Sequence, residues 1–297
     1  MRVLVTGGTG FIGSYLINAL IKKKCNVVAL TRSKSKTGIH DQKIIEWVSI
    51  GNGLEKKLNS FGKFDAIVHL ATSYMRTEGS YSDIEAANVG FPLTLLDFAK
   101  KGGCDFFINA DSYFSKEEFS YQRMPEYILT KQTFSKWGKL ATKLNSNLSF
   151  INARFEHVYG PNDSTSKFIP YLIRSLIKNK ESVKLTECTQ KRDFIYVDDV
   201  VSALICILMN REKKNLQGFL EIQVGTGKDV PLKKLVELCK KITLSENTLM
   251  YGAIKFSADE IMSSKANTRI LKSLGWGQKV SLRAGLEKTI RIERSAT

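Results

Sequence analysis

The stretch Thr6-Gly7-Gly8-Thr9-Gly10-Phe11-Ile12-Gly13 decides the fold class of this chain of 297 residues. The apolar run before it, residues 2–5, is typical of a buried first strand. After it, at residues 14–22, leucine and isoleucine recur at helical spacing. A strand, a glycine-rich turn and a helix in this order are the context that a dinucleotide-binding fingerprint requires.

Each glycine of the fingerprint has a separate physical role. Gly7 permits a tight turn, Gly10 lets the backbone approach a pyrophosphate, and Gly13 lets the helix pack closely on the strand. At Phe11 and Ile12 the helix N-terminus then offers N–H groups and a positive dipole end to the phosphates. The sequence therefore predicts that these five residues bind a nicotinamide dinucleotide; a glycine turn without a ligand is the alternative.

The second strand, expected at residues 26–30, ends in residues that bear on the choice of cofactor. An acidic residue at this point binds the ribose hydroxyls and favours NAD. Here Thr31, Arg32 and Ser33 follow, and hydroxyl groups with a guanidinium suit a 2′-phosphate. We therefore expect NADP(H) in preference to NAD(H), with a basic surface loop as the alternative.

Strands and helices alternate through the first half of the chain. Further strands are expected at residues 44–50, 64–71, 106–109 and 148–155, and helices at 54–61, 81–101 and 126–144. This alternation predicts an α/β fold of the Rossmann type, a doubly wound parallel sheet with its ligands at the carboxyl ends of the strands.

The pattern changes to shorter elements in the second half of the chain. We expect a NADP-binding domain at residues 1–160 and a smaller C-terminal α/β region, at 161–297, that binds the substrate. Within the latter, a segment at roughly 193–226 is expected to return to the first domain. Asp198 is a predicted N-cap for a helix at 199–209.

The net charge is strongly positive, +16 from 45 basic and 29 acidic residues. The lysines are dispersed and do not form the basic stripe with interleaved aromatic side chains that is typical of nucleic-acid binding. A surface that attracts a phosphorylated substrate explains the charge instead. No apolar run reaches membrane-spanning length, and the chain enters its first strand without a signal peptide, so we expect no membrane association.

Cysteine and histidine usage indicates reduced thiols and no metal. The five cysteines are far apart and include no C-x-x-C pair, which is typical of a cytoplasmic protein. The three histidines are His40, His69 and His157, and none pairs with a cysteine, so no metal site is expected. His69 lies within an apolar run and is interpreted as structural.

Tyr127 and Lys131 form a Y-x-x-x-K pair on the helix expected at residues 126–144. Positions i and i+4 share one helix face, so the ammonium can lie beside the phenol. We expect that ammonium and the positive nicotinamide to lower the pKa of Tyr127 from about 10. The phenol can then exchange a proton with a carbonyl or alcohol while hydride moves to or from the nicotinamide. An amphipathic helix with an exposed lysine is the alternative.

With these motifs in place, the sequence resembles the extended short-chain dehydrogenases/reductases of the nucleotide-sugar epimerase, dehydratase and reductase group. The resemblance covers essentially the whole chain. Besides the fingerprint, the motifs that carry it are Val68-His69-Leu70-Ala71, Asn88-Val89-Gly90, Tyr127-x-x-x-Lys131, Val158-Tyr159-Gly160-Pro161, Arg192-Asp193-Phe194-Ile195-Tyr196-Val197-Asp198-Asp199-Val200 and Leu274-Gly275-Trp276.

The resemblance implies roles for individual residues. Tyr127 would be the catalytic acid/base, and Lys131 would hold the nicotinamide ribose. The resemblance also assigns cofactor contacts at Leu70, Ala71 and Asn88, and substrate contacts at Thr72, Asp111, His157, Arg192 and Arg269. The two arginines suit the diphosphate of a sugar nucleotide, because a guanidinium binds phosphate through two parallel hydrogen bonds. Surface ion pairing is the alternative for both.

One position departs from the family's pattern. Its third catalytic residue, a Ser or Thr at the end of the fifth strand, falls on Ala110, which cannot donate a hydrogen bond. Ser112 lies two residues further and shares the strand face of Ala110, so we expect Ser112 to supply the hydroxyl. Asp111 or water in that role, or a weakened enzyme, are the alternatives. Ser112 also replaces the Glu of the Asp-Glu pair of the dehydratase branch, which disfavours a 4,6-dehydratase.

The segments 109–112 and 156–160, together with Tyr127, are similar to bacterial 4-ketoreductases of deoxysugar nucleotides, in the branch of CDP-abequose and CDP-paratose synthases. The resemblance implies NADPH-dependent reduction of the C4 keto group of a nucleotide-linked sugar, CDP-linked and 4-keto-6-deoxy or 3,6-dideoxy, for lipopolysaccharide O-antigen. A NAD-dependent nucleotide-sugar 4-epimerase and a non-catalytic NADP-binding regulator are the alternatives. Because family members commonly dimerise through the helices expected at 81–101 and 126–144, we expect a cytoplasmic homodimer.

Overall fold

The structure is a computed structural model that describes residues 1–32, 45–74, 79–119, 123–178 and 182–296. The chain divides into two compact units, and it crosses between them several times. The first unit comprises Met1–Phe155, Val201–Gln223 and Ile270–Trp276, and the second comprises Glu156–Val200, Val224–Arg269 and Gly277–Thr297. That the first unit binds cofactor and the second binds substrate stays a prediction.

The first unit is built on one seven-stranded sheet in the order β11-β6-β5-β4-β1-β2-β3. Its strands are β1 (Arg2–Thr6), β2 (Asn26–Thr31), β3 (Ile45–Ser49), β4 (Ala66–His69), β5 (Phe106–Ser112), β6 (Ser149–Phe155) and β11 (Phe219–Val224). The pairs from β6 to β3 are all parallel. β11 also runs parallel to β6, since the N–H groups of Phe150 and Glu156 donate to the carbonyls of Gly218 and Val224.

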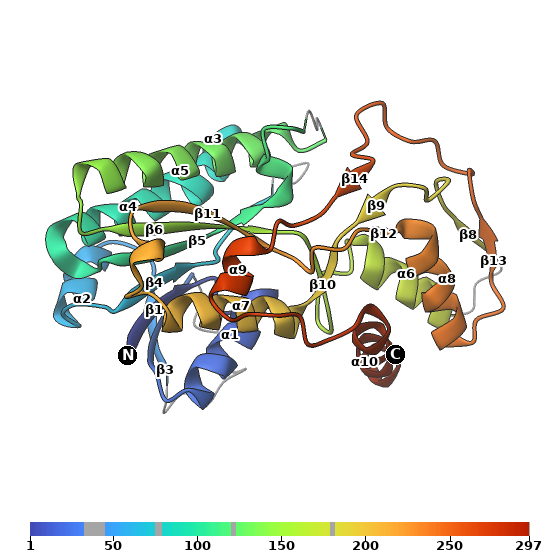
Figure 1. Cartoon of the computed structure of the whole chain (residues 1–297), viewed down its shortest axis with the longest axis horizontal. Coiled ribbons are helices and arrows are strands. Elements are labelled where there is room, and N and C mark those ends of the chain that lie inside the picture. The colour runs from blue at the N-terminus through green and yellow to red at the C-terminus, as the bar shows by residue number, and fades with distance from the viewer. Residues whose placement is uncertain (33–44, 75–78, 120–122, 179–181, 297) are drawn as a thin grey trace. The chain divides into compact units, whose positions relative to one another are not determined.

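Helices cover both faces of this sheet, which confirms the predicted doubly wound fold. Figure 1 shows α3, α4 and α5 on one face and α1 and α7 on the other. The helices are α1 (Phe11–Lys22), α2 (Leu54–Ser60), α3 (Tyr81–Glu85), α4 (Phe91–Phe98), α5 (Pro125–Leu144), α7 (Val197–Met209) and the short α9 (Arg269–Ser273). Because the strands are parallel, their carboxyl ends share one edge of the sheet.

The single helix predicted at residues 81–101 is interrupted twice. A π-helical turn at Ala86–Gly90 joins α3 to α4, and a second one follows α4 at Ala99–Gly103. π-helical turns inside α-helices occur frequently at functional sites. The first of them contains Asn88, one of the residues predicted to contact the cofactor.

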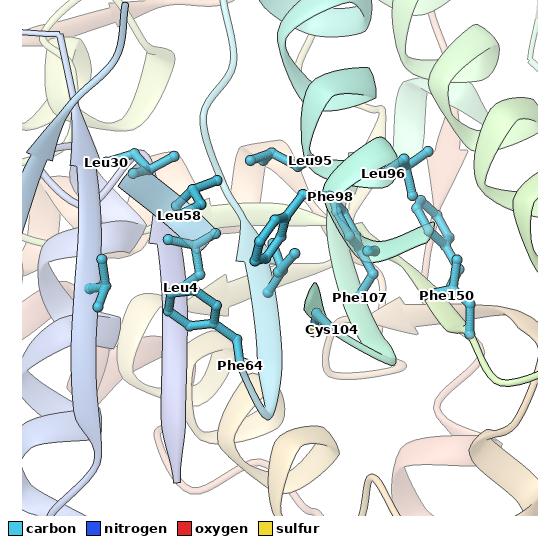
Figure 2. Close-up of a cluster of buried hydrophobic side chains, with 14 of the residues drawn as sticks. Leu4, Leu30, Leu58, Phe64, Leu95, Leu96, Phe98, Cys104, Phe107 and Phe150 are labelled. Carbon is cyan, nitrogen blue, oxygen red and sulfur yellow. The ribbon is translucent and has the colours of Figure 1, made fainter. Parts of the chain in front are cut away.

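One cluster of the first unit's core lies between the sheet and the face covered by α2, α4 and α5. Figure 2 shows side chains of β1, β4, β5 and β6 packed against those of α2 and α4. The rings of Phe107 and Phe150 stack at 5.1 Å, and the ring of Phe134 meets that of Phe150 edge-on at 5.8 Å. Burial of each such side chain contributes about 1.5–3 kcal/mol, so this layer fixes α5 on the sheet.

The second unit has small sheets and amphipathic helices. Its elements are β7 (His157–Tyr159), α6 (Phe168–Ile177), β8 (Ser182–Lys184), β9 (Lys191–Arg192), β10 (Phe194–Tyr196), β12 (Val230–Pro231), α8 (Leu232–Thr243), β13 (Thr248–Met250), β14 (Ser263–Ser264) and α10 (Leu282–Ala296). The fully buried carboxylate of Asp193 joins three of its segments. It accepts the N–H groups of Thr226, Gly227 and Ala266 and the hydroxyl of Thr226, at 2.7–3.1 Å.

The predicted N-cap at Asp198 is wrong. Helix α7 begins at Val197, so Asp198 lies inside its first turn. The next residue, Asp199, uses its carboxylate to accept the N–H groups of Lys279 and Val280 at 3.0 and 2.9 Å. Both acidic side chains still lie at the positive end of the helix dipole, where negative charge is favourable.

Candidate functional site

The turn between β1 and α1 has no room for side chains at Gly7 and Gly13. Gly7 has φ +70°, and a Cβ there would lie 2.7 Å from the backbone nitrogen of Ala71. A Cβ on Gly13 would lie 2.0 Å from the carbonyl oxygen of Gly7. The N–H of Gly10 donates to that same oxygen at 2.9 Å, which closes the turn.

Helix α1 begins at this turn without a side-chain cap on Gly10. The N–H groups of a first helical turn have no acceptor within the helix. A loop of bare backbone that leads into such a turn fits the pyrophosphate of a dinucleotide, with Phe11 and Ile12 in the first turn. The residues present therefore fit a nicotinamide dinucleotide.

The end of β2 is only partly described. Thr31 is buried at the last position of the strand, and Arg32 follows it with an exposed side chain. Ser33 lies outside the described residues. An exposed guanidinium can bind a 2′-phosphate through charge-assisted hydrogen bonds.

The segment after β4 is held by Thr6 and Asn88. The hydroxyl of Thr6 accepts the N–H of Ala71 at 3.1 Å and lies 2.7 Å from Nδ1 of His69. Burial and the nearby Lys131 lower the pKa of His69 to about 3, so its ring is neutral at physiological pH. His69 thus has the structural surroundings expected of a residue in an apolar strand. Leu70 and Ala71, which were predicted to contact the cofactor, follow His69 directly.

Asn88 ties this segment to helix α5. Its Oδ1 accepts the N–H of Ser73 at 2.7 Å and the hydroxyl of Thr72 at 3.4 Å. Its Nδ2 donates to the carbonyl of Ser73 at 2.8 Å and to the hydroxyl of Thr130 at 3.1 Å. Thr130 donates in turn to the carbonyl of Tyr127, so Asn88 sets where the start of α5 lies.

The structure brings together the three residues predicted to be catalytic. Tyr127 and Lys131 lie one turn apart on α5, and both are buried. The ammonium of Lys131 lies 5.8 Å from the centre of the Tyr127 ring and donates to the carbonyl of Ala110 at 2.8 Å. The side chain of Ser112, at the end of β5, makes a hydrogen bond with that of Tyr127.

The protein's own groups raise the pKa of Tyr127. Burial raises this pKa well above 10, Tyr74 and Asp111 raise it further, and the hydrogen bond with Ser112 opposes them. The phenolate is disfavoured because it loses its hydration in the buried site, and the lowering of this pKa by Lys131 together with a bound nicotinamide stays a prediction. Burial likewise lowers the pKa of Lys131 to about 8, against the opposing charge of Asp111. The phenol of Tyr127 therefore keeps its proton at neutral pH, as a general acid requires.

Tyr74 was missed by the sequence analysis. Its ring stacks on that of Tyr127 with centroids 4.7 Å apart and planes inclined at 23°. Tyr74 is 46% exposed, so it is the outer member of the pair. A single aromatic residue in an irregular segment carries no periodic signal that would have identified it.

Asp111 was predicted to contact the substrate, but its carboxylate is occupied by protein donors. Oδ2 accepts from Asn152, Ser115 and Arg154 at 2.7, 2.7 and 3.2 Å, and Oδ1 accepts the N–H of Ser112 at 2.8 Å. Asn152 and Arg154 were also missed. The sequence did contain a signal for these two residues, because their polar side chains interrupt the apolar run of β6.

The remaining predicted substrate residues belong to the second unit. His157 is half-buried on β7, and its ring meets that of Phe194 edge-on at 5.7 Å. Arg192 is buried in an ion pair with Glu260. Arg269 is exposed at the start of α9. Their roles toward a substrate stay predictions.

A cavity of about 660 Å³ lies at the opposite, amino-terminal edge of the sheet. Phe64, Asp65 and Asp105 line it just before β4 and β5 begin. Its charged side chains include the ion pair of Lys63 with Asp105. Because open α/β sheets bind ligands at the carboxyl ends of their strands, the fingerprint edge is the candidate site instead.

Across the described ranges, no helix is long and apolar enough to cross a membrane. The same residues contain no group of three or more His, Cys, Asp or Glu side chains that could hold a metal ion. All five cysteines are free thiols, and burial raises the pKa of Cys104 and Cys239 to about 12.

Residues 3–222 match the NAD dependent epimerase/dehydratase family, and the chain belongs to this family. Its seven-stranded sheet, glycine turn and Tyr127–Lys131 pair agree with that membership. The chain is thus an enzyme, a nucleotide-sugar oxidoreductase that depends on NAD(P).

Among curated relatives, the CDP-abequose synthase of Salmonella typhimurium is 41% identical over 293 residues, which cover 97% of each chain. Among solved structures, MoeE5 in complex with UDP-glucose and NAD is 26% identical with a TM-score of 0.83, covering 100% of this chain and 99% of that one. The UDP-glucose 4-epimerase of Thermotoga maritima, with UDP-glucose, is 22% identical, also with a TM-score of 0.83 and the same coverage. The last of these similarities shows the fold alone.

Proposed function

We propose that this enzyme uses NADPH to reduce the C4 keto group of a CDP-linked 4-keto-6-deoxy or 3,6-dideoxy sugar. The observation that carries the proposal is the buried phenol of Tyr127, which keeps its proton and lies beside Lys131 and Ser112. A reductase needs a proton donor at this point. The 41% identity with CDP-abequose synthase supports the CDP-linked deoxysugar as substrate.

In the proposed reaction the bound cofactor supplies the hydride that reduces the keto carbon. Tyr127 gives its phenolic proton to the alkoxide oxygen that forms, and general acid catalysis of this kind contributes about 10²–10⁴-fold. Ser112 donates a hydrogen bond to the same oxygen while charge develops on it. The nearby ammonium of Lys131 then stabilises the phenolate until Tyr127 takes a proton from solvent.

The proposed preference for NADPH rests on Arg32. Its guanidinium is exposed directly after β2, where a 2′-phosphate binds in this fold. Replacing Arg32 with Ala should weaken NADPH binding about tenfold or more and leave NADH binding unchanged, since a hydrogen bond to a charged group contributes about 1.5–3 kcal/mol. Equal loss for both cofactors would contradict the assignment.

Loss of reduced-nicotinamide absorbance tests the reaction itself. The purified enzyme is mixed with a CDP-4-keto-3,6-dideoxy sugar, with NADPH and NADH in parallel. We expect stoichiometric oxidation of NADPH and a reduced sugar product. Isomerised sugar without net consumption of cofactor would instead establish a 4-epimerase, and cofactor binding without turnover would point to a regulator.

For the nucleotide sugar, we propose contacts from Thr72, His157 and Arg269, of which Thr72 and Arg269 are exposed in the structure. Arg192 would reach the diphosphate only by exchanging its ion pair with Glu260. A guanidinium suits the exchange of a carboxylate for a phosphate, because it makes charge-assisted hydrogen bonds with either group.

We also propose a homodimer formed through α3 and α5. Leu129, Trp137, Leu140 and Leu144 form an exposed apolar stripe along α5, and Tyr81 is 71% exposed on α3. Such a stripe on a monomer is a candidate protein interface. Light scattering should give twice the chain mass, and Trp137→Glu should give the chain mass alone; a monomeric wild type would refute the dimer.

We place the enzyme in the cytoplasm, in synthesis of lipopolysaccharide O-antigen. The five free cysteines support a reducing compartment. Deoxysugar synthesis is supported by the relatives with the name CDP-abequose synthase.

A further inference from the structure

The carboxylate of Asp111 is buried and receives four hydrogen bonds from the first unit. Its side chain is 0% exposed. Two of the donors, the N–H of Ser112 and the hydroxyl of Ser115, belong to the turn that follows β5. The other two, Asn152 and Arg154, belong to the neighbouring strand β6. Asp111 therefore joins the turn to the sheet.

The turn itself is short and starts at Ser112. Residues Tyr113–Ser115 form one turn of 3₁₀-helix, and the hydroxyl of Ser112 accepts the N–H of Phe114 at its start. Ser115 also donates to the carbonyl of Ser112 at 2.8 Å. With both ends of the turn bound to Asp111, the backbone of Ser112 has little freedom to rotate, and its hydroxyl stays directed at Tyr127.

Arg154 makes burial of this carboxylate possible. A buried carboxylate without a partner is strongly unfavourable, and the guanidinium of Arg154 provides the opposite charge at 3.2 Å. The same guanidinium binds Glu221 of β11 at 2.7 Å, which fixes it across three adjacent strands. The register of β5 and β6 pairs Asp111 with Arg154 and Ser112 with Phe155.

We propose that Asp111 is a positioning residue: held by Arg154, it fixes the turn after β5 so that the hydroxyl of Ser112 is directed at Tyr127 and the reacting oxygen. It does not contact the sugar. The inference rests on the proposed reductase function and deepens it, because it explains how an enzyme with Ala110 at the family's hydroxyl position holds a hydroxyl two residues later. Asn152 and Ser115 complete the same set of contacts.

The test is a double-mutant cycle with Asp111→Asn and Ser112→Ala. Ser112→Ala should lower kcat about 100-fold, as loss of one hydrogen bond to a developing oxyanion does. Asp111→Asn should lower kcat about 30-fold with KM within about twofold, because a misplaced group reduces the rate more than binding. In the Ser112→Ala background, Asp111→Asn should lower kcat by less than about threefold, since the two residues act as a unit.

Asp199→Asn is the matched control, because Asp199 is also a buried carboxylate that accepts two backbone N–H groups. It should lower the melting temperature and leave kcat within about threefold. If Asp111→Asn does not fold, Ser115→Ala removes one contact of the same set, and it should lower kcat about fivefold only when Ser112 is present.

Two results would overturn the proposal. Asp111→Asn could keep its full effect in the Ser112→Ala background, or it could raise KM alone, which would mean direct contact with the sugar. If the wild type reduces no 4-keto sugar, the proposed function fails by itself. A crystal structure of Asp111→Asn then decides the positioning role: a displaced turn at Tyr113–Ser115 supports it, and an unchanged turn refutes it.

Discussion

Asp111 at the end of β5 and Asp193 between β9 and β10 are both buried carboxylates with four hydrogen bonds, and their donors differ. Three of the donors of Asp193 are backbone N–H groups and the fourth is a hydroxyl, so a neutral shell surrounds it. The donors of Asp111 include the charged guanidinium of Arg154. Its neighbours Tyr127 and Lys131 both have shifted pKa values.

The difference in donors indicates that Asp193 stabilises the fold and that Asp111 supports the candidate active site. Asp193 joins backbone segments of the second unit, and any change in its charge affects folding first. Asp111 lies near Tyr127 and Lys131, whose pKa values are shifted, and groups with shifted pKa values are typical of functional sites.

Tyr127→Phe tests whether the end of β5 is the catalytic region. If the β5 end is the catalytic region, the turnover rate should fall about 10³-fold or more, because the general acid is lost. Binding of NADPH, measured by the change in its fluorescence, should remain within about twofold. Tyr171→Phe, at an exposed position on α6, is the control and should keep full activity. If Tyr127→Phe retained its turnover, another group would have to be the proton donor.

Asp193→Asn tests whether the buried carboxylate of Asp193 stabilises the fold. An amide presents an NH₂ group to backbone N–H donors, so the unfolding free energy should fall by about 2–4 kcal/mol. The urea midpoint measures this loss, and Asp97→Asn at an exposed position on α4 should change it by less than about 0.5 kcal/mol. An unchanged midpoint in Asp193→Asn would show that its hydrogen bonds contribute little to folding.

The pH dependence of kcat/KM tests whether activity needs the positive charge of Lys131. Because the pKa of Lys131 is lowered to about 8, its ammonium is present below pH 8 and is lost as the pH rises through that value. The groups that face it are His69 from β4, neutral in this range, Asp111 from β5, and Tyr127, which stays protonated. We expect kcat/KM to fall above pH 8, by about tenfold per unit.

Lys131→Arg keeps a positive charge at all these pH values, so it is the control for the fall in kcat/KM above pH 8. Its kcat/KM should be lower than that of the wild type but flat between pH 7 and 9. A falling limb that persists in Lys131→Arg would assign the titration to another group.

The sequence predicted the sheet, the glycine turn and the Tyr127–Lys131 pair because each depends on residues close together in the chain. The end of β5 was predicted at residue 109, and the strand continues to Ser112. That extension puts Ser112 on a regular strand face, as the choice of Ser112 over Ala110 assumed.

The partners of Asp111 could not be predicted in the same way. They depend on the lateral register of β5 and β6, which aligns Asn109 with Asn152 and Asp111 with Arg154. A linear pattern gives the faces of each strand but not the offset between two strands that are joined by a long helix. For the same reason, the sequence did not predict the burial that raises the pKa of Tyr127, since neighbours in sequence were known and burial was not.

The π-helical turn at Ala86–Gly90 has a consequence for chain length. Each residue of an α-helix turns the backbone by about 100°, and a π-helical turn accommodates one residue more than an α-helical turn. A relative with a regular helix at this point would match this chain only through a one-residue gap. Asn88 lies in this turn and contacts both Ser73 and Thr130, so deletion of Val89 tests whether those contacts need the extra residue.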